Sequence, residues 1–280
     1  MKTGLIDVGG GLRGIYAAGV MDHFLDDGVS FDLGIGVSAG SANISSFIAG
    51  QKKRNYAFYT EYSQRDEYMS RRNISKKGCY LDVSYIYGTL SNSGGENPLD
   101  FKALCESPTE FIAVATDAIG GEVKYFTKAD MRPDYYNVLM ASSAIPYVCR
   151  PQEVDGTLYY DGALSDPVPI EKAFAMGCDR VVLVLTNPVD YLKDKDEDIR
   201  LAERIRDRYP LSAEALISRA EKYNTSVDLA KQLEHEGKVR IIAPFDTCGV
   251  DTLTKDVKAL DALYRIGYED GADIKKFLIG

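Results

Sequence analysis

A strand, a tight turn and a helix meet in the stretch Gly36-Val37-Ser38-Ala39-Gly40. The apolar run 31–36 before it predicts a short buried strand, and residues 39–48 have the periodicity of a helix. A Gly-x-Ser-x-Gly motif in this context is typical of a nucleophile elbow, in which the serine is exposed at the N-terminus of the helix. Ser38 is therefore the candidate nucleophile, and Gly36 and Gly40 keep the turn free of clashes.

A glycine cluster, Gly9-Gly10-Gly11-Leu12-Arg13-Gly14, directly follows the first predicted strand, residues 3–8. Glycines let backbone N–H groups approach a bound group, and the N-terminus of the helix predicted at 13–27 favours an anion there. The anion is either a dinucleotide pyrophosphate or the oxyanion of a tetrahedral intermediate. A nucleotide-dependent oxidoreductase also requires an acidic residue at the end of the second strand, whereas Asp32 stands at its start. The neighbouring elbow therefore favours the oxyanion.

A third motif, Tyr159-Tyr160-Asp161-Gly162-Ala163, ends the apolar run 157–160. Ligands of open α/β sheets bind at the carboxyl ends of the strands, so Asp161 is expected on the same rim as Ser38 and the glycine cluster. An Asp-Gly pair is also a common turn sequence.

The choice of a base for Ser38 is narrow, because the chain has two histidines. His23 lies inside the helix predicted at 13–27. His235 follows the chain order of a Ser-Asp-His triad, but it stands before a strand and therefore at the amino edge of the sheet. A Ser38–Asp161 dyad is predicted instead, with Ser38 Oγ about 2.6–3.2 Å from the carboxylate or somewhat further without a ligand.

Strands alternate with helices along most of the chain, which predicts a three-layer α/β/α fold around a central, mostly parallel sheet. Further strands are expected at 110–116, 123–126, 180–185 and 238–243, and helices at 135–143, 169–176, 213–234 and 255–278. Residues 70–97 are expected to be irregular, and 190–209 to form an exposed charged helix. One domain over 1–280 is predicted, with the motifs at about 4–190 and a charged, helical part at 191–280.

Composition excludes several classes of function. The net charge of −9 argues against nucleic acid as a partner, since phosphate binding needs a cationic surface. The chain has no apolar run of transmembrane length, and no secretory leader is expected, because an acidic residue and a glycine cluster come too early for its apolar region. Five cysteines without a Cys-x-x-Cys pair predict reduced thiols in the cytoplasm. No pattern predicts a metal or another cofactor.

Positive charge is concentrated in residues 52–77. This segment carries eight basic and three acidic residues, a net +5, so the rest of the chain carries −14. Tyrosines and a phenylalanine are interleaved with the basic residues. Such a run is either a solvated surface or a contact for anionic lipid head groups at a membrane.

Taken together, the three motifs resemble the patatin-like phospholipase family, particularly its bacterial members, over about residues 4–190. The resemblance implies that Ser38 is the nucleophile, that Asp161 is the base, and that the oxyanion hole is formed by Gly9, Gly10, Gly11 and Arg13. The segment Ala141-Ser142-Ser143-Ala144-Ile145-Pro146 is similar to the one that lines the substrate side of the site. Val8 stands where plant patatins carry an acidic residue, and Ala163 where many members have glycine.

The resemblance implies a lipid acyl hydrolase, a phospholipase A-type esterase that needs no cofactor. A catalytically silent module of the same fold, which binds an anion or a lipid for regulation, stays open as the alternative. The head group, the acyl-chain length, the oligomeric state and the role of residues 191–280 are not fixed by the sequence.

Overall fold

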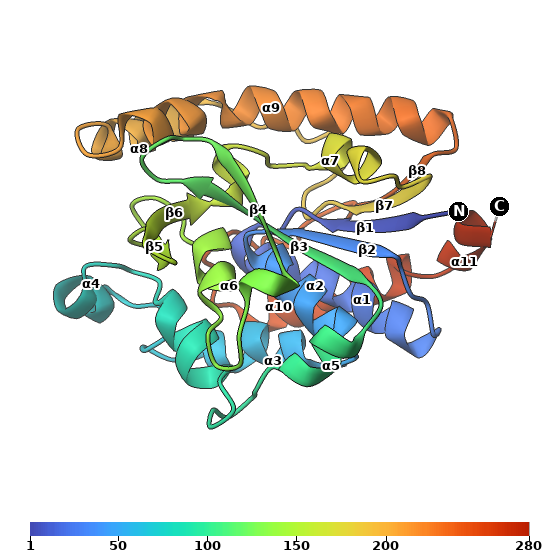
Figure 1. The fold of residues 1–280 in the computed structure, drawn as a ribbon, viewed down its shortest axis with the longest axis horizontal. Coiled ribbons are helices and arrows are strands. Elements are labelled where there is room, and N and C mark those ends of the chain that lie inside the picture. Colours follow the sequence, from blue (N-terminus) through green and yellow to red (C-terminus); the bar gives the residue numbers. More distant parts are fainter. Residues whose placement is uncertain (280) are drawn as a thin grey trace.

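A single sheet forms the centre of the computed structural model, which describes residues 1–279 (Figure 1). The strand order is β5-β6-β3-β2-β1-β7-β8, and β4 pairs with β3 beside this path. Five strands are mutually parallel: β1 (Thr3–Asp7), β2 (Leu33–Val37), β3 (Glu110–Asp117), β7 (Arg180–Val184) and β8 (Val239–Ile242). Three are antiparallel to their neighbours: β4 (Val123–Thr127), β5 (Gln152–Val154) and β6 (Thr157–Asp161). The predicted mostly parallel sheet is confirmed.

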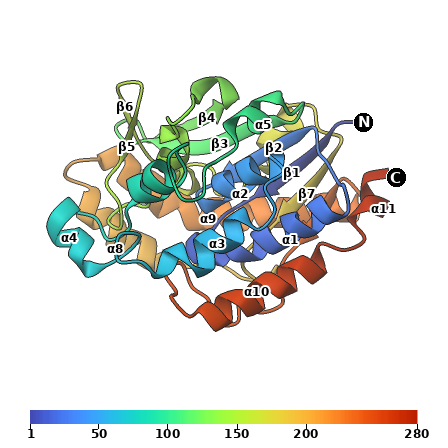
Figure 2. The ribbon, with the colours of Figure 1, turned by 90° about the horizontal axis from the view of Figure 1, so that it is seen from below.

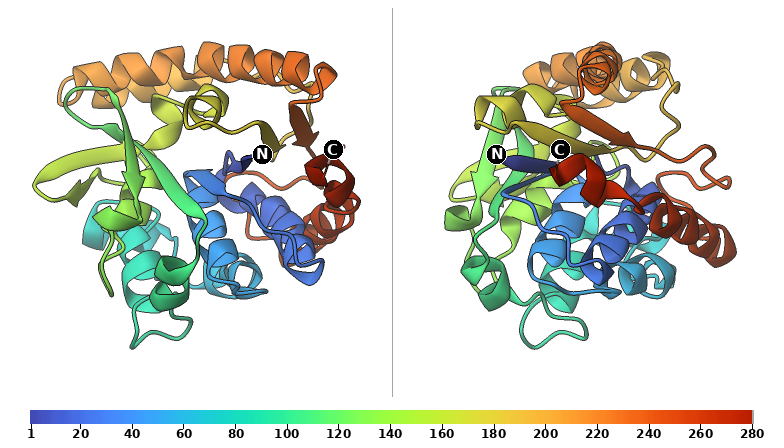
Figure 3. Two further views of the ribbon diagram at one scale, coloured as in Figure 1. Left: turned by 45° about the vertical axis from the view of Figure 1, so that its right-hand side comes forward. Right: turned by 90° about the vertical axis from the view of Figure 1, so that its right-hand side faces the viewer.

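Helices cover both faces of the sheet. One face carries α1 (Ile15–Asp26), α2 (Ala39–Ile48), α3 (Arg54–Thr60), α5 (Phe101–Glu106) and α10 (Val257–Asp270), and Figure 2 shows α10 lying along α1. The other face carries α7 (Ile170–Ala175), α8 (Asp196–Ile205) and the long α9 (Pro210–His235), which crosses above the sheet (Figure 3). The three-layer α/β/α architecture is therefore as predicted.

The central strands are apolar on both faces because both faces are covered. In β1, Leu5 belongs to the core on the α1 side and Ile6 to the core on the α9 side. In β7, Val182 and Leu183 divide between the two cores in the same way. All four side chains are fully buried. This alternation explains why these strands read as continuous apolar runs.

Some predicted boundaries were wrong. The segment expected to be irregular contains α4 (Arg71–Lys77) and a π-helix at Tyr85–Leu90. The single helix expected at 255–278 ends at Asp270 and continues as α11 (Ile274–Ile279). The break covers residues 271–273, and at Gly271 the chain lies so close to α1 that an added Cβ would be 2.9 Å from His23 Cβ. Short elements carry too few residues for a periodic signal, which is why β5, α3 and α5 were missed.

One edge of β3 is shared by two strands that arrive from opposite directions. Residues 112–114 of β3 pair with β2 on one edge and with β4 on the other. At Ala115 and Thr116 the partners are β4 and β6, so β6 occupies the edge that β2 leaves after Val114. The carboxyl ends of β2 and β6 therefore face one another along β3.

Candidate active site

Ser38 forms the turn between β2 and α2. Its backbone has φ 57° and ψ −133°, a conformation that non-glycine residues rarely adopt and that is common in strained functional turns. The Ser38 N–H donates to Ser142 Oγ at 3.0 Å, and the Ser38 carbonyl accepts from Ser41 Oγ at 2.8 Å. These bonds hold the turn in place, and the side chain is only 6% exposed.

The elbow glycines allow helix α2 to begin against the end of β1. A Cβ on Gly40 would lie 2.3 Å from the carbonyl oxygen of Asp7, and one on Gly36 would lie 2.3 Å from Ser41 Cα. No other residue fits at these distances. The sequence prediction of an elbow between a strand and a helix matches this geometry.

Asp161 ends β6 and is buried, with 2% of its surface exposed. Its Oδ1 accepts the N–H of Ala163 at 2.9 Å, whereas Oδ2 has no hydrogen-bond partner within the described residues. Burial raises the pKa of the Asp161 carboxyl to about 6, and the Ser38 hydroxyl and the Ala163 N–H act in the opposite direction. Ser38 thus lies close enough to the Asp161 carboxyl to favour its ionised form. A Cβ on Gly162 would lie 2.2 Å from the carbonyl oxygen of Val114, so the two backbones are in tight contact.

The glycine cluster lies beside the elbow. Gly9 has φ 69°, and an added Cβ would lie 2.2 Å from the carbonyl oxygen of Val37. Its N–H donates to Asp7 Oδ1 at 2.8 Å, and the N–H of Leu12 donates to the Thr252 carbonyl at 3.0 Å. Within residues 1–279 the N–H groups of Gly10 and Gly11 have no such acceptor. The Gly9 N–H is therefore already bound to Asp7 Oδ1, whereas the N–H groups of Gly10 and Gly11 are the ones left for a ligand.

Asp7 was given no role in the chemistry, yet it organises this part of the site. It is fully buried, and its Oδ2 accepts from Asn43 Nδ2 at 2.8 Å. The same Asn43 amide donates to the carbonyl of Gly14, and Asn43 Oδ1 accepts from Tyr59 at 3.1 Å. Burial raises the pKa of Asp7 to about 6. The sequence analysis did not predict this network; the signal that could have pointed to it is a charged residue inside an apolar strand.

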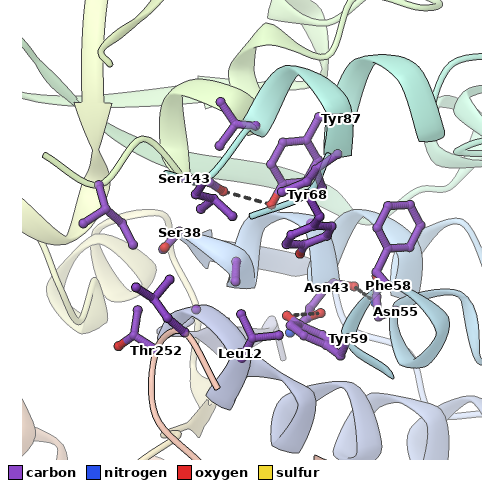
Figure 4. Close-up of a pocket in the computed structure, with 18 of the residues that line it drawn as sticks. Leu12, Ser38, Asn43, Asn55, Phe58, Tyr59, Tyr68, Tyr87, Ser143 and Thr252 are labelled. Carbon is purple, nitrogen blue, oxygen red and sulfur yellow. Dashed lines mark hydrogen bonds between the residues drawn. The ribbon is translucent and has the colours of Figure 1, made fainter. Parts of the chain in front are cut away.

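Ser38 lies where two pockets adjoin. The apolar pocket is lined mainly by aliphatic and aromatic side chains, and Figure 4 shows the Ser38 side chain at one end of it. The polar pocket also contains Asp161 and the glycine cluster. The cavity volumes are about 40 Å³ for the apolar pocket and 350 Å³ for the polar one. Apolar lining residues include Leu12, Phe58, Tyr68, Leu81, Ile86 and Tyr87.

The segment 141–146 lines the site, as the resemblance implied. Ser142 holds the Ser38 N–H, and Ser143 contacts the Tyr87 hydroxyl at 3.0 Å (Figure 4). Ile145 lines both pockets.

The histidines and Asp32 lie away from the site, as expected. His235 is exposed at the end of α9, which Figure 1 places near the amino end of β1. His23 lies in α1 against Tyr268. Asp32 accepts the N–H of Thr3 at 2.7 Å, at the amino end of β1. None of the three lines either pocket.

Most of the segment 52–77 is engaged within the molecule. Arg54 is buried and donates to Ser46 and Ser91, both at 2.9 Å, while Lys52, Arg65 and Lys77 form ion pairs with acidic side chains. The interleaved aromatic residues pack into the core or line the apolar pocket. Among residues 52–77, the exposed cations without an ion pair are Lys53, which lies over the Tyr56 and Tyr264 rings, and Arg71, Arg72 and Lys76 on α4.

Within residues 1–279, no group of three or more His, Cys, Asp or Glu side chains is arranged to hold a metal ion. None of the helices in the same range is both long and apolar enough to cross a membrane.

A mostly parallel sheet with an elbow serine, a buried carboxyl group and an apolar pocket is the architecture of a hydrolytic α/β enzyme. A model of the patatin-like phospholipase family matches residues 8–174, and the chain belongs to this family. Membership confirms the predicted class of enzyme, a hydrolase of lipid esters. A domain of unknown function (DUF6363) matches residues 209–278.

Several proteins are similar to the chain over long stretches. "Uncharacterized protein YjjU" of Escherichia coli is 27% identical over 95% of this chain and 75% of its own. "Uncharacterized NTE family protein Rv1063c" of Mycobacterium tuberculosis is 26% identical over 74% of this chain, which spans 55% of that protein. "Lysophospholipase NTE1" of Yarrowia lipolytica is 24% identical over 67% of this chain but only 13% of its own length.

The fold is also found in a solved structure. VipD from Legionella pneumophila superposes with a TM-score of 0.51 at 14% identity, covering 99% of this chain and 66% of that one. At this identity the comparison establishes the fold alone.

Proposed function

We propose that the chain hydrolyses acyl esters of lipids by a Ser38–Asp161 dyad. The observation that carries the proposal is the meeting of β2 and β6 along β3, which brings the elbow serine and a buried carboxyl group together. The carboxyl oxygen Oδ2 lacks a partner, and its pKa of about 6 suits a base that works at neutral pH. The family membership supports the same reaction.

Acylation is a proton transfer coupled to attack. Asp161 accepts the proton of Ser38 Oγ while Oγ bonds to the ester carbonyl carbon, whose oxygen becomes an oxyanion. The free N–H groups of Gly10 and Gly11, with Arg13 beside them, are the proposed donors to that oxyanion. The C–O bond to the alcohol then breaks, and the departing oxygen takes the proton from Asp161.

Deacylation repeats the same steps with water. Asp161 accepts a proton from the attacking water, the acyl carbon is released as a carboxylic acid, and Ser38 Oγ regains its proton. The apolar pocket takes the acyl chain in this arrangement, because it is the apolar cavity that reaches Ser38 (Figure 4).

The test uses a fluorophosphonate label and p-nitrophenyl butyrate hydrolysis. The wild-type chain is expected to be labelled at Ser38 and to turn over the ester, whereas Ser38→Ala loses both. The kcat of Asp161→Asn is expected to be about 10³-fold or more below that of the wild-type chain. The alternative, a silent binding module, gives no label and no turnover in the wild-type chain. A variant of either residue with full activity would refute the dyad.

Two further proposals concern where the reaction takes place. Peripheral contact with an anionic membrane is proposed through α4, whose exposed Arg71, Arg72 and Lys76 flank Ile74, 52% exposed. Tyr68 and Leu81, on either side of α4 in the chain, line the apolar pocket, so this contact is close to the proposed acyl site. A cytoplasmic location is proposed because the five cysteines are free thiols.

A further inference from the structure

Three cationic side chains line the polar pocket beside Ser38: Arg13, Lys193 and Arg219. Arg13 belongs to the 3-10 turn Gly11–Gly14, Lys193 to the loop after β7, and Arg219 to α9. The last two lie beyond residues 8–174, and Arg219 lies inside the matched domain of unknown function. In acyl transfer as proposed above, Lys193 has no role and Arg219 acts only at a distance, by favouring the ionised form of Asp161.

Arg219 is held rigidly with one side of its guanidinium unoccupied. Its Nε donates to Asp198 Oδ2 at 2.9 Å and its Nη2 bonds to Asp198 Oδ1, and Asp198 is fully buried. A two-pronged bond of this kind fixes the plane of the guanidinium. Within the described residues Nη1 of Arg219 has no hydrogen bond, so it remains available to a ligand in the pocket.

Lys193 forms no ion pair with an acidic side chain among residues 1–279. Its backbone is fixed by Asn224, which accepts the Lys193 N–H at 2.9 Å and donates to the Lys193 carbonyl at 3.1 Å. Its half-buried ammonium forms neither an ion pair nor a hydrogen bond with residues 1–279. Burial lowers the pKa of Lys193, the nearby positive charges of Arg219 and Arg13 lower it further, and the carboxylates of Asp198 and Glu197 act in the opposite direction. A partly desolvated, unpaired cation is unfavourable without an anion beside it.

Arg13 completes the cluster next to the glycines. Its Nη1 donates to Thr252 Oγ1 at 3.2 Å, while its Nε is buried without a partner among the described residues. The guanidinium lies against Gly10, since an added Cβ there would be 3.4 Å from Nη2. Of the carboxylates that line this pocket, Asp161 forms no ion pair with the three cations, Asp251 is 3.7 Å from Arg13 Nη1 but 81% exposed, and Glu197 is also exposed. Only Arg219 is therefore neutralised by a buried carboxylate.

We propose that this cluster binds the phosphate of a lipid head group whose acyl ester lies at Ser38. An unesterified phosphate carries up to two negative charges and several acceptor oxygens, which matches three converging cationic donors. The apolar pocket and the polar pocket share Ser38, so a single-chain phospholipid can place its acyl chain in one and its phosphate in the other. The C-terminal part of the chain thereby provides head-group selectivity. The inference rests on the proposed function, because it takes Ser38 as the atom that attacks the ester.

The kinetic test compares lysophosphatidic acid with the monoacylglycerol of the same acyl chain, both below their micelle-forming concentrations. The wild-type chain is expected to favour the phosphate-bearing lipid by roughly tenfold or more in kcat/KM. Lys193→Gln is the diagnostic variant, because Lys193 has no ion pair to break, and it is expected to reduce that preference by roughly tenfold. Lys195→Gln is the matched control, since Lys195 is exposed two residues away and lines neither pocket.

The ratio of the two kcat/KM values decides the outcome. A ratio that is the same in the wild-type chain and in Lys193→Gln overturns the proposal, and so does an equal loss of the ratio in Lys195→Gln. Arg219→Gln is not the first choice, because it leaves the buried Asp198 charge unpaired and can unfold the chain.

A binding test in the Ser38→Ala background separates this inference from the proposed function, because it needs no turnover. Dodecyl phosphate, followed by calorimetry, is expected to bind about tenfold more tightly to Ser38→Ala than to Ser38→Ala/Lys193→Gln. Equal affinities would refute the phosphate site even if hydrolysis is observed. If glycerol 3-phosphate binds as tightly as dodecyl phosphate, the site serves a free phosphate ester and the lipid assignment is wrong. Failure of the proposed function is a different result, namely no hydrolysis and no Ser38 label while head-group binding persists.

Discussion

Asp161 pairs with Ala115 across the antiparallel strands β6 and β3, one residue beyond the position at which β3 pairs with the last residue of β2. Ser38 follows that last residue, Val37, so the elbow and the carboxyl group reach the same level of β3 from opposite directions. Thr116 Oγ1 donates to the Asp161 carbonyl at 2.8 Å and holds the end of β6 there. Two strand ends that face each other along one edge are the structural basis of the proposed dyad.

Hydrolysis should increase as the pH rises through about 6. Asp161 must be ionised to accept a proton, and burial raises the pKa of its carboxyl from 3.8 to about 6. The measurement is kcat/KM for p-nitrophenyl butyrate between pH 4.5 and 8.5 in the wild-type chain. A profile without an inflection between about pH 5 and 7 would contradict the assignment of Asp161 as the base.

Asp161→Asn should stabilise the fold above pH 6 while it abolishes activity. The folded pKa of about 6 lies above the ordinary value of 3.8, so ionisation of Asp161 costs stability once the pH exceeds about 4, and the full cost is present above about 6. A pKa rise from 3.8 to about 6 corresponds to about 3 kcal/mol, which is an upper bound on the stability gained when the carboxylate is replaced by a neutral amide. The measurement is the free energy of unfolding in urea of the wild-type chain and the variant, at pH 8 and at pH 4.5. A variant that gains no more stability at pH 8 than at pH 4.5 would speak against the buried charge.

Asp7→Ala should damage both stability and catalysis. The substitution leaves the Gly9 N–H and the Asn43 amide without their acceptors in a fully buried site, at a cost of about 2–4 kcal/mol. We also expect kcat to fall by about 10–100-fold, because the glycine cluster loses its anchor. Asp32→Ala is the control, since Asp32 is exposed at the other edge of the sheet. Unchanged kcat in a folded Asp7→Ala variant would remove Asp7 from the site.

Ile86→Ala should shift the preference toward longer acyl chains. The apolar pocket has a cavity volume of about 40 Å³, so its walls limit the length of the acyl chain that it takes. Ile86 is 3% exposed and lines the pocket, so its truncation enlarges the cavity at a cost of about 2–4 kcal/mol in stability. The readout is the ratio of kcat/KM for octanoyl and butyryl p-nitrophenyl esters. The same ratio in both proteins would place the acyl chain elsewhere.

Removing the three exposed charges of α4 should weaken binding to anionic vesicles. Each cation near an anionic surface contributes about 1 kcal/mol, so Arg71→Gln/Arg72→Gln/Lys76→Gln is expected to lose up to about 100-fold in affinity. The measurement is co-sedimentation with vesicles rich in phosphatidylglycerol, against phosphatidylcholine vesicles. The control triple variant is Lys258→Gln/Lys275→Gln/Lys276→Gln, which removes the same number of exposed charges from α10 and α11. Equal binding by the α4 variant and the wild-type chain would disprove this contact.

Local features of the site could be predicted from the sequence. The elbow at Ser38 and the start of α2 at Ala39 depend on residues adjacent in the chain, and turn chemistry acts at that range. The position of Asp161 at a strand end was predicted for the same reason. The argument that brought it to Ser38 was wrong, however, because β6 is antiparallel to β3 and does not share the carboxyl edge of the parallel strands.

By itself, the sequence determined the strand–turn–helix units, the glycine cluster and the alternation of elements that builds an α/β/α sandwich, since each follows from short-range periodicity and backbone sterics. The tertiary structure alone decided that the Gly9 N–H donates to Asp7 and that the carboxyl ends of β6 and β2 face each other along β3. It also brings Lys193 and Arg219 to the polar pocket beside Ser38. Lys193 is more than 150 residues from Ser38 in the chain. Strand register and helix packing join such distant residues, and both are set by burial across the whole core rather than by any local pattern.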